Sequence, residues 1–247
     1  MSDNCKHEAL PDETSPGTVT MYNRDDVLAQ VQKNGLALKH ASAALRADRV
    51  VVLAAVAQHY CALRYASAAL QGDAEVVLTA AAQDGDALAY ASDALKANRE
   101  FMLAVVSLNF CSFSALSYAS TAIKDDAAVL LAAVALNPQA LQFASHAPRA
   151  DREVILAAVA KDAYWGLQFT SCELKADREV ILAAVAQNGF FGLKRASLEL
   201  RADRAVVLAA VAQNGDALQF ASDELRTDRE VLRVAAATAM RKRTEAV

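Results

Sequence analysis

The stretch DREVILAAVAQNG, residues 177–189, recurs with small changes along the whole chain. Its first residue is an aspartate or asparagine in nine copies, which are Asn23, Asp48, Asp73, Asn98, Asp126, Asp151, Asp177, Asp203 and Asp228. Each copy begins 25 residues after the one before it, apart from an interval of 28 after the fourth copy and of 26 after the sixth and seventh. Such a fixed period is typical of repeat architectures. We number these repeats one to nine and count positions from the first residue of each, leaving out the extra residues of the fourth, sixth and seventh repeats.

Two helices are predicted in each repeat. Asp or Asn at position one is a good N-cap, and the apolar run after it predicts a first helix that is buried between its neighbours. Asn-Gly, as at Asn188-Gly189, predicts the end of that helix. Leucine at position sixteen, a small residue at nineteen and leucine or isoleucine at twenty-three predict a second, amphipathic helix of about ten residues. The sequence therefore predicts an all-α fold, an α-solenoid of about 8.5 tandem 25-residue helix-turn-helix repeats that forms an open superhelix.

The ends and the middle of the chain differ from the regular repeats. Residues 1–22 are predicted to be a flexible N-terminal leader, and residues 23–247 the helical repeat domain. The fourth repeat has three extra residues. The fifth contains Pro138 in its turn and Pro148 where other repeats have leucine or isoleucine, and Pro148 is expected to shorten the second helix of that repeat. Either this region changes the curvature and divides the domain into 23–125 and 126–247, or a local adjustment absorbs the change.

Composition excludes several classes of function. The net charge is -4 and no basic stripe stands out, which argues against a nucleic-acid partner. The four cysteines show no paired spacing, and no secretory signal or membrane span is recognisable. We therefore expect an intracellular, cytoplasmic protein. The oligomeric state is left open.

Segments such as DREVILAAVAQNG, with the LQFASDELR of residues 218–226, resemble the repeat family catalogued as domain of unknown function 4116. The resemblance covers roughly residues 23–240 and implies an all-helical repeat fold. It brings no activity, cofactor or catalytic residue with it. The fifth repeat departs most from the family's wording.

No catalytic or metal-binding pattern is present among the histidines and cysteines, so we expect no enzyme, no cofactor and no metal site. Cys61, Cys111 and Cys172 are interpreted as small apolar filler residues. The serine that recurs at position twenty is interpreted as a small residue at a helix contact, with its hydroxyl bonded to a carbonyl one turn back. The arginines of the Asp-Arg-Glu motif are expected to form a solvated network along one edge.

Aromatic residues suggest two places of interest. Position eighteen is aromatic in six repeats, which indicates either a seam between successive second helices or a face that stacks against an extended ligand. The turns joining the two helices hold further aromatics only in certain repeats, which are the second, fourth, sixth and seventh. These aromatics are Tyr60, Phe110, Phe113, Tyr164, Trp165, Phe190 and Phe191.

We predict that this aromatic-rich turn edge binds a protein or peptide partner, so that the chain is a non-catalytic interaction or scaffold module. Alternatively, the same aromatics cover the ends of their own helix pairs. A different alternative is a small-molecule or pigment carrier with an apolar pocket near the irregular repeats.

Overall fold

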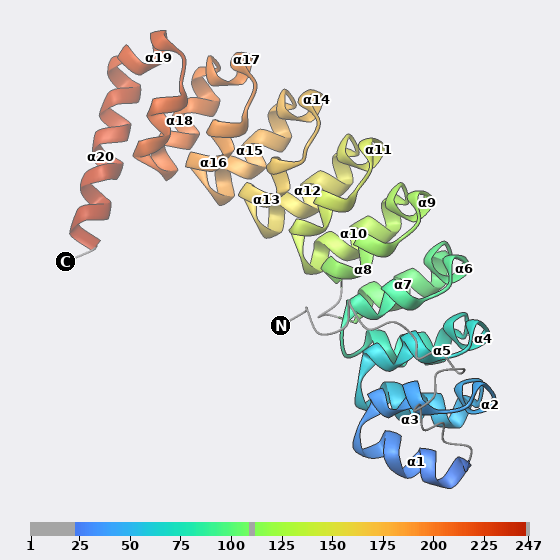
Figure 1. Ribbon diagram of the computed structural model, residues 1–247. Helices are drawn as coiled ribbons and strands as arrows, with labels where there is room; N and C mark the ends of the chain where they lie inside the picture. Colours follow the sequence, from blue (N-terminus) through green and yellow to red (C-terminus); the bar gives the residue numbers. More distant parts are fainter. Residues whose placement is uncertain (1–22, 109–111, 246–247) are drawn as a thin grey trace. The chain divides into compact units, whose positions relative to one another are not determined.

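The computed structural model describes residues 23–108 and 112–245 (Figure 1). Every regular element in these ranges is helical, which confirms the predicted all-α repeat solenoid. The helices form two compact units that divide between Ile123 and Lys124. We call them the N-terminal and the C-terminal unit and describe each by itself. That the repeat domain divides into two separate parts between residues 125 and 126 stays a prediction.

Each repeat begins with a first helix, as predicted. In the N-terminal unit these are α1 (Arg24–Lys33), α3 (Arg49–Gln58), α5 (Ala74–Ala81) and α7 (Arg99–Ser107). In the C-terminal unit they are α10 (Ala127–Leu136), α12 (Arg152–Lys161), α15 (Arg178–Gln187), α18 (Arg204–Gln213) and α20 (Arg229–Glu245). The aspartate at position one is the N-cap. Asp177, for example, accepts hydrogen bonds from the amides of Glu179 at 2.9 Å and Val180 at 3.1 Å.

The first helices are buried on one side rather than all around. In the second to eighth repeats, positions four, five and eight lie in the core, where Val180, Ile181 and Ala184 of α15 have no exposed surface. The leucine at position six, Leu182 in this helix, is half-buried. The first helix thus contacts the first helices of the repeats before and after it, as α15 does with α12 and α18, while its remaining face is only partly covered.

The rest of each repeat contains two short helices instead of one. The second helices are η1 (Gly35–His40), η2 (Tyr60–Tyr65), η3 (Gly85–Tyr90), α8 (Ser112–Tyr118), η4 (Pro138–Phe143), α13 (Ala163–Gln168), α16 (Gly189–Arg195) and η5 (Gly215–Phe220), where η marks a 3₁₀ helix. The third helices are α2 (Ala43–Arg46), α4 (Ala68–Gln71), α6 (Asp93–Lys96), α9 (Thr121–Lys124), α11 (His146–Arg149), α14 (Cys172–Lys175), α17 (Leu198–Arg201) and α19 (Asp223–Thr227). Within the C-terminal unit the third helices follow one another along one edge (Figure 1).

The division falls at the serine of position twenty, which caps the third helix in most repeats. Ser197 has extended backbone angles, and its hydroxyl accepts a hydrogen bond from the Leu200 amide at 3.4 Å, so it is the N-cap of α17. Its own amide donates to the Lys175 carbonyl of the previous repeat at 2.9 Å. The interpretation of this serine as a residue inside one long helix is wrong.

Pro148 does not shorten a helix, contrary to the prediction. It lies in the first turn of α11, which has the same four residues as most other third helices. A proline is tolerated there because a first-turn amide has no partner within the helix. Without that amide, Ser145 has no N–H to cap, and its hydroxyl bonds to the Lys124 carbonyl at 3.3 Å instead.

Most third helices have a basic residue in their last turn, a pattern that the sequence interpretation did not include. These residues are Arg46, Lys96, Lys124, Arg149, Lys175, Arg201 and Arg226. Arg201 donates to the carbonyls of Ala196 at 3.0 Å and Lys194 at 2.6 Å, at the end of the second helix. Arg149 donates likewise to the Gln142 carbonyl at 2.9 Å. Cations here stabilise the carbonyls that a helix end leaves without partners.

Two cysteines differ from their predicted role as small apolar filler residues. Cys61 is buried but disulfide-bonded, a pairing that the cysteine spacing did not indicate. Cys172 is a free, exposed thiol at the start of α14 and fills no core position.

Candidate functional site

The sixth and seventh repeats each have one extra residue, which changes the geometry of their second helix. The regular eighth repeat has six residues in 3₁₀ geometry, Gly215–Phe220, whereas the seventh has seven in α geometry, Gly189–Arg195. With a rise of about 2.0 Å and about 1.5 Å per residue, the two helices cover similar lengths of roughly 12 Å and roughly 10 Å. The added residue is thus absorbed by a change of helix type, which rotates the side chains of the first turn.

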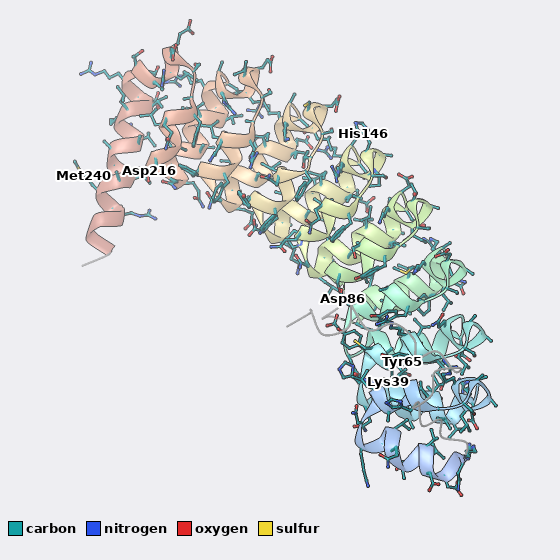
Figure 2. All side chains as sticks on the ribbon, in the orientation of Figure 1. Lys39, Tyr65, Asp86, His146, Asp216 and Met240 are labelled. Atoms are coloured by element: carbon teal, nitrogen blue, oxygen red, sulfur yellow. The ribbon has the colours of Figure 1, made fainter. Side chains whose placement is uncertain are left out.

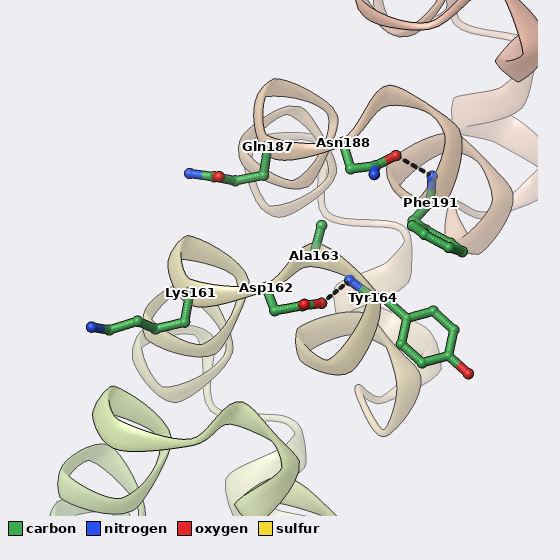
Figure 3. A pocket seen from close by; sticks show the side chains of 7 residues that line it. All are labelled: Lys161, Asp162, Ala163, Tyr164, Gln187, Asn188 and Phe191. Carbon is green, nitrogen blue, oxygen red and sulfur yellow. Dashed lines mark hydrogen bonds between the residues drawn. The ribbon is translucent and has the colours of Figure 1, made fainter.

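Two N-caps fix the orientation of the aromatic residues on these helices. Asp162 accepts from the amides of Tyr164 at 2.8 Å and Trp165 at 3.0 Å. Asn188 accepts from the Phe191 amide at 3.2 Å in the same way. Figure 3 shows that the rings of Tyr164 and Phe191 lie on the same side of their helices. The aromatics therefore belong to the first turns of α13 and α16, and not to loops as the sequence suggested.

The aromatic side chains of three consecutive repeats contact one another. We call the surface that they form, consisting of Tyr164, Trp165, Phe169, Phe190, Phe191 and Phe220, the aromatic surface. The centroid of the Tyr164 ring lies 5.0 Å from those of both Trp165 and Phe191, with the planes at 81° and 65°. Phe190 continues the row, 5.4 Å from Phe191 and 4.8 Å from Phe220. All six rings are half-buried, so each retains surface that solvent or a partner can reach.

Three cations lie over these rings. The Lys194 ammonium is 5.7 Å from the centroid of Phe190 and 5.9 Å from that of Phe220. The Arg195 guanidinium is 5.8 Å from the Tyr164 ring. On the other side, the Arg149 guanidinium is 5.5 Å from the Phe169 ring. A cation–π contact contributes about 0.5–1 kcal/mol at an exposed site, so these contacts favour a positive rim around the aromatic surface.

Four of the seven predicted site residues are brought together here: Tyr164, Trp165, Phe190 and Phe191. Phe110 lies outside the described residues, and the side chain of Phe113 is not among those described. Phe169 and Phe220 belong to the aromatics of position eighteen, for which the sequence left open a seam or a stacking face and which it did not connect with the turn aromatics. The three cations were also missed.

Tyr60 lies elsewhere, in η2 of the N-terminal unit. Its ring stacks on His59 at 5.4 Å, and burial together with the carboxylates of Asp84 and Asp86 raises the pKa of its phenol. Asp86, labelled in Figure 2, also accepts a hydrogen bond from the Tyr118 hydroxyl at 3.3 Å. Tyr60 therefore belongs to an acidic, tyrosine-rich surface, which differs in charge from the aromatic surface.

A small pocket lies beside the aromatic surface, between the starts of α13 and α16 (Figure 3). Its volume is about 200 Å³, and its lining includes Lys161, Asp162 and Gln187 besides Tyr164 and Phe191. Pockets for small organic ligands usually measure about 300–1,000 Å³ and are mostly apolar. This pocket therefore gives the carrier interpretation no support. Among the described residues, no group of three or more His, Cys, Asp or Glu side chains could hold a metal ion.

A family model described as a domain of unknown function, DUF4116, matches residues 23–71, 73–124, 151–201, 191–226 and 203–236. These matches cover well over half of the chain. The chain belongs to the DUF4116 family. Comparison with curated proteins and with solved structures finds no match. Residues 125–150, which the DUF4116 matches leave out, correspond to the fifth repeat with Pro138 and Pro148.

The charged edge of the DUF4116 repeats contains ion pairs between neighbours, as the sequence predicted. The Arg152 guanidinium lies 3.2 Å from the Asp177 carboxylate of the next repeat, and Arg178 lies 3.1 Å from Asp203. In the N-terminal unit, Arg49 lies 3.1 Å from Asp73. Because these arginines are 45–52% exposed, each pair contributes at most about 1 kcal/mol. The edge therefore serves the repeat-to-repeat contact and carries little unpaired charge.

No helix in the described ranges is long and apolar enough to cross a membrane.

Proposed function

We propose that this chain is a non-catalytic interaction module that binds a protein or peptide through its aromatic surface. The observation that supports the proposal is the row of six half-buried rings that contact one another across three repeats. Contiguous exposed aromatic side chains are common anchors in protein interfaces, where tyrosine and tryptophan contribute most. The step from this surface to binding is an analogy with such interfaces.

The position of the rings favours binding over mere coverage of the core. The core of these repeats is already filled by aliphatic side chains, since Leu167 and Leu193 have no exposed surface. Tyr164 and Phe190 instead contact rings of the next repeat. The rings thus lie over a core of aliphatic side chains, and each keeps part of its own surface exposed. An intracellular role of this kind needs no cofactor.

Serine substitutions at Trp165 and Phe191 test the proposal. Trp165→Ser and Phe191→Ser should each abolish partner capture while the far-UV circular dichroism stays that of wild type, because neither ring is part of the aliphatic core. Leu136→Ser is the matched control, since Leu136 is an exposed apolar residue, 44% accessible, outside the aromatic surface. Proteins captured by wild type and by Leu136→Ser, but not by the other two variants, support the proposal. The same proteins captured by all four chains would overturn it.

A further inference from the structure

The aromatic surface and the charged edge differ in how their positive charges are balanced. At the edge, each of Arg152, Arg178 and Arg204 pairs with a carboxylate of the next repeat. At the aromatic surface, within the described part of the chain, Lys194, Arg195 and Arg149 contact rings, a carbonyl or an amide, but no carboxylate. Carboxylates of the same chain thus neutralise the arginines of the charged edge, whereas the cations at the aromatic surface remain available to carboxylates of a partner.

Lys194 is the cation best placed to meet a partner. Its ammonium lies between the rings of two repeats, within 6 Å of the Phe190 and Phe220 centroids, and the residue is exposed. The nearby guanidinium of Arg195 donates to the Gln168 side chain and is half-buried. Lys194 therefore holds an ammonium group with three N–H donors at the Phe220 end of the aromatic surface, where it pairs with no carboxylate among the described residues.

The surface continues past Phe220 into a second groove of about 420 Å³. Leu198 borders this groove and is 76% exposed, the most exposed of the large apolar residues described. Arg201 and Arg226 line it as well, and Arg226 pairs with Asp223 of its own helix. The groove adds an apolar contact and further positive charge next to Lys194.

Carboxylates near the aromatic surface are few. Asp162 caps α13, where the positive end of the helix dipole balances its charge. Asp216, labelled in Figure 2, is exposed in the first turn of η5. Together with Asp223, which lines the groove, three carboxylates thus face three ring-bound cations and the two groove arginines, so the local charge is positive although the chain carries -4. A positive apolar surface favours a negative apolar partner.

We propose that the aromatic surface, with the groove at Leu198, binds an acidic peptide segment in which aspartate or glutamate residues flank an apolar side chain. This proposal rests on the proposed function and names its class of partner. The apolar side chain packs against the rings and Leu198, and a flanking carboxylate meets the Lys194 ammonium.

A single-stranded nucleic acid is also anionic and stacks on aromatic rings, but the geometry here favours a peptide. Phe190 stands at 90° to Phe191 and at 78° to Phe220, so these rings offer edges and clefts more than parallel faces. Base stacking needs an open ring face. Aliphatic side chains fit between rings arranged edge to face.

Selection from a displayed library of random linear peptides on the full chain tests the composition of the partner. Sequences in which Asp or Glu flank Leu, Phe, Trp or Met should be enriched on wild type and lost on Phe191→Ser. Enrichment of neutral or basic peptides that is lost on Phe191→Ser would overturn the acidic partner and leave the proposed function standing. Failure to enrich any peptide, or enrichment that Phe191→Ser does not affect, would overturn the acidic-peptide partner, whereas the capture experiment with Trp165→Ser and Phe191→Ser decides the proposed function.

The strongest selected peptide then serves as the probe in a titration followed by the fluorescence of Trp165, the only tryptophan of the chain. Lys194→Gln should weaken binding about two- to fivefold, as expected for one exposed ion pair, and Lys194→Glu about four- to twenty-five-fold. Lys33→Glu is the matched control, since it makes the same charge change on an exposed lysine of α1. Equal weakening by Lys33→Glu, or tighter binding of an oligothymidylate than of the peptide, would overturn the proposal.

Discussion

Gly192 allows the second helix of the seventh repeat to approach its first helix, and Gly192→Ala should therefore destabilise the fold. A Cβ atom on Gly192 would lie 2.6 Å from the Val185 nitrogen and 2.8 Å from both its Cα and its Cγ2. Ordinary contacts to a Cβ begin at 3.4 Å, so α16 would have to move by most of an ångström. Overpacking of this kind costs about 1–3 kcal/mol.

A glycine in a helix interior also has a cost, and replacing it with alanine returns up to about 1 kcal/mol. The clash involves backbone atoms and a β-branched side chain, which cannot move aside, so we place it at the upper end of its range. The net destabilisation of Gly192→Ala is then about 1–2 kcal/mol. Because α16 carries Phe190 and Phe191, its displacement should also change the fluorescence of Trp165.

Gly72→Ala is the matched control. A Cβ on Gly72 would meet its nearest atoms at 3.4 Å or more, and the equivalent position is alanine in other repeats, as at Ala176 and Ala202. The backbone there has a φ of -100°, which alanine adopts freely. Gly72→Ala should stabilise by about 0.4–1 kcal/mol through the unfolded chain. The assay is urea unfolding followed by circular dichroism at 222 nm. A Gly192→Ala protein as stable as wild type would refute the close-approach argument, and so would equal losses in both variants.

Two further predictions concern the caps that begin the first helices. Asp177→Ala removes both the cap of α15 and the ion pair with Arg152, so it should lower the free energy of unfolding in urea by about 1–2 kcal/mol. Asp177→Asn keeps a capping oxygen and should lower it by less than about 1 kcal/mol. Equal losses in the two variants would show that the charge of Asp177 matters more than its cap. The second prediction concerns acid. The Val180 amide, assisted by the Arg152 guanidinium, holds the pKa of the Asp177 carboxyl below its usual value, and the Val206 amide does the same for Asp203. A lowered folded pKa gives stability that is complete above the unfolded pKa of about 3.9 and is lost as the pH falls through the folded pKa. The melting temperature should therefore hold from neutral pH to about pH 4 and fall below it, and a steady fall between pH 7 and pH 5 would contradict this assignment.

The first helices could be predicted because their signals are local. An aspartate such as Asp177 caps the amides two and three residues ahead of it, whatever the rest of the chain does. The apolar run that follows then needs only a neighbour to cover one stripe. Since every repeat supplies the same helix to the next, the period itself predicts that neighbour.

The division of the second helix was missed because its apolar spacing fits two structures. Leu193 at position sixteen and Leu200 further on are both buried, as one helical stripe would require. The same residues are buried when Ser197 turns the chain between two short helices. A signal was nevertheless present, since Ser197 is followed two residues later by Glu199, whose carboxylate suits a first turn. This N-cap signal was missed because serine is also one of the small residues that commonly occur where two helices are in contact.

The aromatic surface depends on a chain of causes that begins with one added residue. That residue converts a 3₁₀ helix into an α-helix in repeats six and seven, and the α-helix requires Gly166 and Gly192 where the regular eighth repeat has the buried Ala217. Each glycine brings its helix against the backbone of the first helix, and the first turn then carries aromatics outward. Such a change is compatible with the fold because each repeat contacts only its neighbours. Two adjacent repeats with the same insertion are needed for Tyr164 to meet Phe191, which is why this ring contact forms between repeats six and seven.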